Sequence, residues 1–331
     1  MSSAIPPLDP ILEPVVDRYR TCEFATLSKS GVPIAWPTAT LRRPDGTFLI
    51  TTSIALPQKA YNVRRDPRVA MLFSDPTASG LEGAPEVLVP GTAVCPDEVV
   101  TDVRRNEEYW RRLTQRQPIN KIYSANALTR RMFDWYYMRL LITVTPIAVS
   151  ARPPLPPGTG TRADGAPDGV AGDALRQLST FPSAVLATCD PDGAPRLRRV
   201  RVTGSAGDEL ALDVPEPDDE LRPGPASLLA HSHDEQLWSL RSVGVVGELL
   251  AGGQRWTFHP ERIVGDSGRA SPVAILRQMR GLRGTARAYL ERRSLERPQI
   301  PWPAVRALKS DVSAGGTEQR PEPAEGPPSS R

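Results

Sequence analysis

Apolar and polar residues alternate over short stretches through most of this chain of 331 residues. Turn signals separate the stretches, and Ser30-Gly31 and Pro44-Asp45-Gly46 supply the glycine that a tight hairpin needs. This pattern is typical of a β-rich protein. It predicts strands over residues 24–28, 34–42, 47–52, 69–74, 87–94 and 140–149, and again over 183–189, 197–202, 209–214, 227–231, 242–250 and 255–264.

Helical spacing of apolar residues occurs in fewer places. Residues 8–20 predict an entry helix, and residues 58–66 predict a short helix that begins next to Lys59. Asp66-Pro67 ends that short helix, because the residue before a proline is pushed out of the α region. Two more apolar faces predict a connecting helix and a C-terminal helix. They consist of Val99, Val103, Trp110 and Leu113, and of Ile275, Met279, Leu282, Ala286 and Tyr289.

One segment of the chain occurs twice, near Phe24 and again near Ala184. Three residues of the first copy recur 162 positions later, and two further segments match with their glycines in register. The pairs are Thr26 and Thr188, Gly31 and Gly193, Pro33 and Pro195, and then VLVPGTA with Gly91 and VGVVGEL with Gly247. Two copies of one fold follow from this repeat. The predicted fold class is mainly β, with two tandem small barrels and peripheral helices forming a pseudo-dimer.

The composition changes along the chain and divides it into segments. The chain exceeds the roughly 100 to 200 residues expected for one domain, and residues 152–173 are rich in Pro and Gly, as in an exposed linker. The predicted organisation is an entry segment 1–20, a first barrel 21–151, the linker 152–173, a second, degenerate barrel 174–265, a helical segment 266–310 and a disordered tail 311–331.

Charge and cysteine content argue against several classes of partner. The formal net charge is only +3 and the basic residues are spread along the chain, so no nucleic-acid partner is expected. The stripe Arg277, Arg280, Arg283 and Arg287 could bind phosphate or nucleic acid, but it is more typical of a solvated helix face. The three cysteines have no metal-ligand spacing and suit a reducing cytoplasm. No secretory signal or bilayer-spanning apolar run is evident, so a cytoplasmic location without membrane contact is expected.

The three histidines all lie in the second half of the chain, and no hydrolase or zinc motif accompanies them. The pair His231-x-His233 leaves a metal or haem iron as an alternative, although histidines after a strand are more often turn residues. Hydrolysis and zinc chemistry are therefore not expected.

The first copy carries candidate phosphate partners. Thr51, Thr52 and Ser53 end a predicted strand, and Lys59 lies at the start of a helix. Hydroxyls, a helix N-terminus and an ammonium are groups that bind phosphate. The ordinary interpretation is turn chemistry beside a solvated lysine. Together these residues predict an anion site.

The second copy has different residues at the corresponding positions. Asp213, Val214 and Pro215 replace the Thr-Thr-Ser run, and Leu221 falls on or near the position of Lys59. An acidic run lies between them, and its carboxylates repel an anion. They are Glu216, Asp218, Asp219 and Glu220. The second copy is therefore expected to have lost its own phosphate site.

Six motifs of the first copy occur in the order ATLSKSGVP, DGTFLITTS, QKAYN, NVRRDPRVAMLF, VLVPGTA and RLLITVTPIAV. In this set and order the chain resembles the pyridoxamine 5'-phosphate oxidase-like, FMN-binding split-barrel superfamily, which includes deazaflavin-dependent reductases. The resemblance covers residues 21–151 well and 181–265 weakly. In that family two barrels pair, usually as a homodimer, with the cofactor between them. The resemblance therefore implies a fused pair that is monomeric, with a homodimer as the alternative.

The resemblance also implies a cofactor and its contacts. It places the phosphate of an FMN at Thr51, Thr52, Ser53 and Lys59 with Gln58 and Asn62 nearby, and the ring along residues 37–42, which include Thr38 and Thr40. In the second copy it points to Trp238, Arg241 and Ser242. The ordinary interpretation is a core aromatic for Trp238 and a surface ion pair for Arg241. A deazaflavin cofactor is the alternative, and haem is a further one. No catalytic residue is identified, because the redox chemistry belongs to the ring.

The function that the resemblance implies is a flavin-dependent oxidoreductase acting on a small-molecule substrate, with one cofactor per chain between the two barrels. The alternative is a non-catalytic flavin, deazaflavin or haem-binding protein, and a third is a fold without a cofactor. The C-terminal R-L-x-P signature of the vitamin-processing oxidases is not evident. Pyridoxamine phosphate is therefore not the expected substrate.

Overall fold

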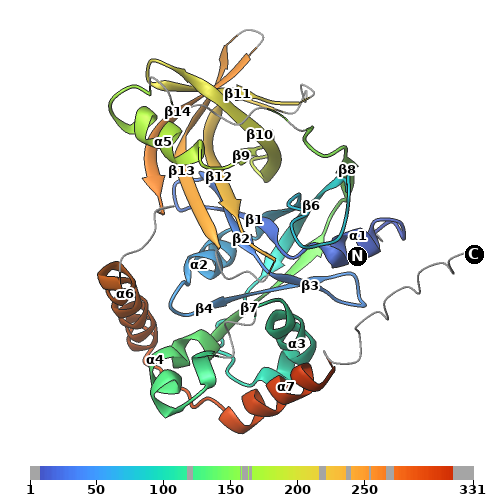
Figure 1. Ribbon diagram of the computed structural model, residues 1–331, viewed down its shortest axis with the longest axis vertical. Coiled ribbons are helices and arrows are strands. Elements are labelled where there is room, and N and C mark those ends of the chain that lie inside the picture. Colours follow the sequence, from blue (N-terminus) through green and yellow to red (C-terminus); the bar gives the residue numbers. More distant parts are fainter. Residues whose placement is uncertain are drawn as a thin grey trace, which may run out of the picture.

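The computed structural model describes residues 8–117, 122–156, 158, 163, 166–215, 221–235, 240–252, 255–265 and 272–315. Two β units lie one above the other, and the C-terminal helices lie beside the first unit (Figure 1). The first unit contains α1 (Glu13–Arg18), β1 (Cys22–Leu27), β2 (Pro33–Thr38), β3 (Thr40–Arg42), β4 (Phe48–Ser53), α2 (Gln58–Arg65), β5 (Arg68–Phe73), β6 (Glu86–Val94), the 3₁₀ helix η1 (Val103–Asn106), α3 (Glu107–Arg116), α4 (Ala127–Tyr137), β7 (Arg139–Pro146) and β8 (Ser150–Arg152). The second unit contains α5 (Val170–Leu178), β9 (Ala184–Cys189), β10 (Pro195–Ala206), β11 (Glu209–Asp213), β12 (Gly224–Ser232), β13 (Arg241–Gly252) and β14 (Arg255–Val264), and α6 (Pro272–Glu291) and α7 (Trp302–Gly315) follow it.

The two sheets have the same order of strands. The second is a closed barrel in the order β10-β11-β14-β13-β12-β9, and the first runs β2-β1-β5-β6-β7-β4-β3, with β8 paired to β6. The orders coincide when β2 and β3 together take the place of the long strand β10, because the first sheet is interrupted at Ala39 whereas β10 has a bulge between Val202 and Gly204. The predicted fold class, mainly β with two barrel-type units, is confirmed.

Matched glycines support the repeat at atomic detail. A Cβ on Gly91 would lie 2.6 Å from the Thr145 carbonyl oxygen, and a Cβ on Gly247 would lie 2.0 Å from the His259 carbonyl oxygen. Each glycine pairs with a proline of the next strand, Pro146 in one unit and Pro260 in the other. Both units therefore use one device, a strand crossing too close for any side chain.

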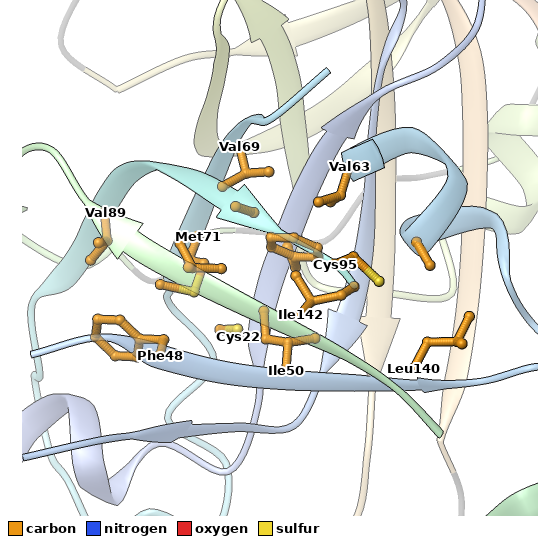
Figure 2. Packing of buried hydrophobic residues seen from close by; sticks show 14 of the residues in the cluster. Cys22, Phe48, Ile50, Val63, Val69, Met71, Val89, Cys95, Leu140 and Ile142 are labelled. Carbon is orange, nitrogen blue, oxygen red and sulfur yellow. The ribbon is translucent and has the colours of Figure 1, made fainter. Parts of the chain in front are cut away.

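Each unit has its own apolar core. In the first, Figure 2 shows Phe48 and Ile50 of β4, Met71 of β5, Val89 of β6 and Ile142 of β7 pointing toward one another. Burial of such side chains contributes about 1.5–3 kcal/mol each. The core of the second unit is built from the inward residues of β9 to β14 together with one face of α5.

A third apolar cluster joins the two units. It combines small residues of the first unit with residues of β9, β10 and β12. Its members are Ala25, Ala35, Ala70, Leu72 and Leu88 on one side, and Val185, Ala187, Leu197 and Leu229 on the other. Short side chains allow the strands of the two units to approach closely, so the packing between the units resembles a core.

Buried polar groups lie beside this interface. Glu23 of β1 has no exposed surface, and its carboxylate accepts hydrogen bonds from Arg199 at 2.9 Å and Ser74 at 3.0 Å. The Nε2 atom of His231 lies 2.7 Å from the same carboxylate. Arg199 and His231 belong to the second unit, so a charge of the first unit is neutralised by the other.

The C-terminal helices return to the first unit (Figure 1). Ala286, Tyr289 and Leu290 of α6 are part of the first core, and Val305 and Leu308 of α7 pack with residues of η1, α3 and α4. The first unit is thus completed by residues that follow the second in sequence.

Most predicted strands occur within a few residues of their expected bounds. The predicted strand 34–42 is divided into β2 and β3, and β10 extends to Ala206. The entry helix is shorter than expected. Helix α4 was not predicted, and α7 runs to Gly315, beyond the predicted end of the helical segment at 310. The remaining tail lies outside the described residues.

The described helices include none that is both long enough and apolar enough to cross a membrane. The thiols of Cys22, Cys95 and Cys189 are free, and the first two are buried.

Candidate functional site

Lys59 lies in the first turn of α2, where the helix has no side-chain cap. Pro57 is the N-cap residue and provides no side-chain hydrogen bond, so the first backbone N–H groups are left for another partner. The Lys59 ammonium donates to the Thr38 hydroxyl at 3.0 Å and lies 5.9 Å from the centre of the Trp36 ring. Side chains of β2 therefore position the predicted lysine.

The ammonium of Lys59 is incompletely compensated. Burial lowers the pKa of Lys59 to about 8, the nearby Cys22 thiol opposes this change, and the Arg139 guanidinium adds to it. Since burial disfavours a charged amine, an anion next to Nζ would stabilise the charged form. The electrostatics of this position favour a bound anion.

A pocket of about 420 Å³ opens beside this lysine, and we call it the Lys59 pocket. Its volume is in the range of small-molecule sites. Trp36 and Tyr61 give it aromatic walls, and Arg292, which follows α6, adds a second cation. The lining residues are Trp36, Ala55, Leu56, Pro57, Gln58, Lys59, Tyr61, Thr285 and Arg292.

The hydroxyls at the end of β4 are engaged within the protein. Thr51 donates to the Tyr109 hydroxyl at 3.1 Å, Thr52 to the Leu56 carbonyl at 2.7 Å, and Ser53 to the Trp135 carbonyl at 2.6 Å. All three residues are buried, and they are not among the described residues that line the Lys59 pocket. They hold the segment that leads into α2 rather than facing the pocket.

Of the other predicted residues of the first copy, one lines the pocket and two form hydrogen bonds within the protein. Gln58 lines the pocket and donates to the Asn62 side chain at 2.9 Å. Asn62 is buried and donates to the Thr26 hydroxyl at 2.9 Å, which ties α2 to β1. The Thr40 hydroxyl donates to the Leu49 carbonyl at 3.2 Å, within the pairing of β3 with β4. The structure thus brings Thr38, Gln58 and Lys59 together.

The predicted residues of the second copy lie elsewhere. Arg241, the first residue of β13, donates to the Thr180 hydroxyl at 3.0 Å and lies over the Phe181 ring. Ser242 pairs with His231 on β12. Neither is among the described residues that line the Lys59 pocket. Trp238 lies outside the described residues.

Of the described residues that line the pocket, sequence reasoning predicted only Gln58 and Lys59. It missed both aromatic walls, Tyr61 and Trp36, although Trp36 directly precedes the segment assigned to the ring. Thr285 and Arg292 belong to the C-terminal segment, more than 220 positions after Lys59. No local pattern shows that this segment returns to α2.

The histidine pair is part of the buried polar interface. His231 contacts Glu23, and the Nδ1 atom of His233 lies 2.9 Å from the Asp234 carbonyl. Across the part of the chain that is described, no group of three His, Cys, Asp or Glu side chains is arranged to hold a metal ion.

No family model and no curated protein matches the chain. Solved structures do match it. A pyridoxamine 5'-phosphate oxidase-like protein of Listeria innocua is 16% identical and matches 43% of this chain and 94% of its own, with a TM-score of 0.29. An F420 reductase is 19% identical, with shares of 43% and 98% and a TM-score of 0.28. The haem storage protein HutZ of Vibrio cholerae is 15% identical, with shares of 42% and 94% and a TM-score of 0.30.

Each of these matches spans less than half of the chain and nearly all of the other protein. The solved structures to which this chain is similar are thus split-barrel proteins of the pyridoxamine 5'-phosphate oxidase-like and F420 reductase types.

Proposed function

We propose that the Lys59 pocket binds the phosphate of one flavin-type cofactor, FMN or a deazaflavin, and that the protein is an oxidoreductase acting on a small molecule. One observation carries this proposal. The desolvated Lys59 ammonium and the uncapped start of α2 meet at a pocket with aromatic walls. A cation and free N–H groups recognise phosphate, and a flat aromatic wall suits a ring.

The donors that fit the cofactor differ from those expected. Thr51 and Ser53 donate their hydroxyl protons to protein acceptors, so they are not needed for the phosphate. Lys59, Gln58 and the first N–H groups of α2 would hold it, and Arg292 would add charge from the opposite wall. The described donors are sufficient for one phosphate.

The chain's own residues orient and enclose the ligand. Trp36 and Tyr61 offer faces for the ring, and Leu56, whose side chain is exposed, adds an apolar wall. A bound flavin or deazaflavin ring would supply two-electron chemistry, which needs little from the protein beyond orientation and electrostatics. The pocket therefore suits oxidation or reduction of a small molecule.

We also propose that the protein works as a monomer. The second unit packs on the first through a fully buried apolar cluster and through Glu23, as a partner subunit would. Light scattering at several concentrations tests this, and a constant dimer mass contradicts it.

Titration with FMN and with a deazaflavin cofactor, followed by absorbance and ligand fluorescence, tests the site. We expect Lys59→Ala to weaken binding about ten- to hundredfold, because a hydrogen bond to a charged group contributes about 1.5–3 kcal/mol. Lys29→Ala is the matched control, since Lys29 is exposed on the turn between β1 and β2. Arg292→Ala should produce a smaller loss.

Equal affinities of wild type and Lys59→Ala would contradict the location of the phosphate. Binding without turnover across a panel of reductants and acceptors would favour the non-catalytic alternative. A haem absorption band in the purified protein would favour haem over a flavin as the cofactor.

A further inference from the structure

A second cavity is lined by residues of both barrels, among them Ser150 and Arg152 of β8. Figure 1 shows the position of β8 in the first unit. The second cavity has a volume of about 310 Å³, and an adjoining cavity of about 210 Å³ shares Arg152 and Arg198 with it. We call the larger one the arginine pocket. Its lining residues are Leu88, Pro90, Ala148, Ser150, Arg152, Leu186, Thr188, Arg196, Leu197, Arg198 and Leu221.

The arginine pocket is the counterpart of the Lys59 pocket in the second unit. Trp36 pairs with Phe24 in the first sheet, and Arg198 pairs with Leu186 in the second, each at the position 162 residues later. Leu221 lies only near the position of Lys59, because the offset falls to 157 by the next strand, where Ala70 pairs with Ala25 and Ser227 pairs with Ala187. The repeat therefore replaces the aromatic Trp36 by the cation Arg198.

Three guanidinium groups converge on this cavity from two units. Arg152 comes from β8, and Arg196 and Arg198 come from alternate positions of β10, so both of the latter project from the same face of that strand. Among the described residues, no carboxylate lines the arginine pocket itself. The cations of the arginine pocket therefore lie on β8 and β10, whereas those of the Lys59 pocket lie on α2 and after α6.

Two carboxylates of the described residues lie near these arginines. Asp190 pairs with Arg196 at 3.3 Å, and Glu86 lines only the adjoining cavity, where it accepts a hydrogen bond from the Leu155 backbone. Burial raises the pKa of Glu86, and the guanidinium groups of Arg199 and Arg152 oppose this change. The acidic residues Glu216, Asp218, Asp219 and Glu220 lie outside the described residues.

Arg152 is the strongest sign of a ligand. Its Nη1 atom is buried and has no hydrogen-bond acceptor in the described part of the chain. A buried donor without an acceptor costs about 1–3 kcal/mol, and a charged one costs more. A ligand oxygen in the pocket would satisfy it.

The apolar walls define the rest of the ligand. Leu88 of the first unit faces the same cavity as Leu186, Leu197 and Leu221 of the second. Arginine binds phosphate and carboxylate groups in a bidentate manner, and the leucines exclude water from an attached ring or chain. We propose that the arginine pocket is a second binding site, distinct from the Lys59 pocket, for a small organic phosphate or carboxylate with an apolar body.

Isothermal titration calorimetry with phenyl phosphate, benzoate and inorganic phosphate tests this site. We expect phenyl phosphate to bind more tightly than inorganic phosphate, because only the former uses the leucine walls. A preference for benzoate would identify a carboxylate ligand. Arg152→Gln is the primary variant, since it removes a guanidinium with an unsatisfied donor and should weaken binding at least tenfold.

Arg198→Ala is the second variant, and Lys59→Ala is the control that separates this site from the proposed cofactor pocket. Arg222→Gln serves as a surface control, because Arg222 is exposed and does not line the cavity. We expect Arg222→Gln to bind as the wild type does, and Lys59→Ala to retain the binding event that Arg152→Gln weakens. Absence of wild-type binding at millimolar phenyl phosphate would overturn the proposal, as would loss of binding in Lys59→Ala with retention in Arg152→Gln.

Discussion

The two barrels share an order of strands, but they differ in the connection that follows β4 in the first unit and its counterpart β11 in the second. In the first unit, Ile54 to Pro67 joins β4 to β5 and contains α2 with Lys59. In the second, only Val214 to Pro223 joins β11 to β12. Residues 216–220 of this connection lie outside the described residues. Among the residues that are described, the cations that line the corresponding cavity come from β8 and β10.

This difference shows which parts of the repeat are structural. Gly91 and Gly247, each opposite a proline of the next strand, are kept because two strands cross there. The lysine of α2 is not kept, because the barrel does not need it to close. The glycines that the fold requires recur in both copies, while the residues of the proposed Lys59 site have diverged.

The largest effect is expected where the two units depend on each other. Glu23→Ala would leave Arg199 and His231 in a buried site without their carboxylate, and breaking such a pair costs about 3–5 kcal/mol. Urea unfolding followed by circular dichroism measures the loss. Asp173→Ala is the control, because both side chains of its pair with Arg176 are about half exposed and such a pair is worth about 0–1 kcal/mol. Equal losses in the two variants would show that the buried interface is not special.

The next effect compares the two strand crossings. Gly247→Ala and Gly91→Ala each place a methyl group against a backbone carbonyl, and overpacking of this kind costs about 1–3 kcal/mol. We expect the larger loss for Gly247, whose added Cβ would come closer. Gly204→Ala, with open space around it, should change stability by less than about 0.5 kcal/mol. A reversed order of melting temperatures would contradict the matched geometry.

The pH dependence of anion binding sharpens the contrast between the pockets. The pKa of Lys59 is lowered to about 8, so its ammonium is largely present below pH 8 and is lost as the pH rises above it. Affinity for FMN should therefore fall about tenfold between pH 8.5 and pH 9.5. Binding of phenyl phosphate to the arginine pocket should change little, since arginine stays protonated. A flat FMN profile would argue against Lys59 as the phosphate partner.

The smallest effect concerns an exposed contact between the units. Arg68 of the first unit donates to the Asp192 carbonyl of the second at 2.7 Å and pairs with Asp66. Arg68→Ala should cost only about 0–1 kcal/mol, because the side chain is substantially exposed. Arg104→Ala, which removes a pair inside the first unit, is the control and should unfold at the same urea concentration as the wild type. If Arg68→Ala lowered the free energy of unfolding as much as Glu23→Ala, exposed contacts would stabilise the interface as much as the buried ones do.

The amino-acid sequence alone determined the repeat, nearly all of the strands and the short helix that carries Lys59. Alternation of apolar residues and turn glycines are local signals, and they do not depend on which strand is the neighbour. The correspondence between Gly91 and Gly247 in the two copies could also be found from the sequence, since both lie in matching apolar runs.

The surroundings of those elements depend on contacts between segments that are far apart in the sequence. Thr51 and Ser53 look like phosphate donors in sequence, but Tyr109 and the Trp135 carbonyl take their hydroxyls. Arg292 reaches the Lys59 pocket through α6, and Arg152 meets Arg196 and Arg198 across the two units. These side chains are distant in sequence and are brought together by burial of apolar surface over the whole molecule, which no local pattern encodes.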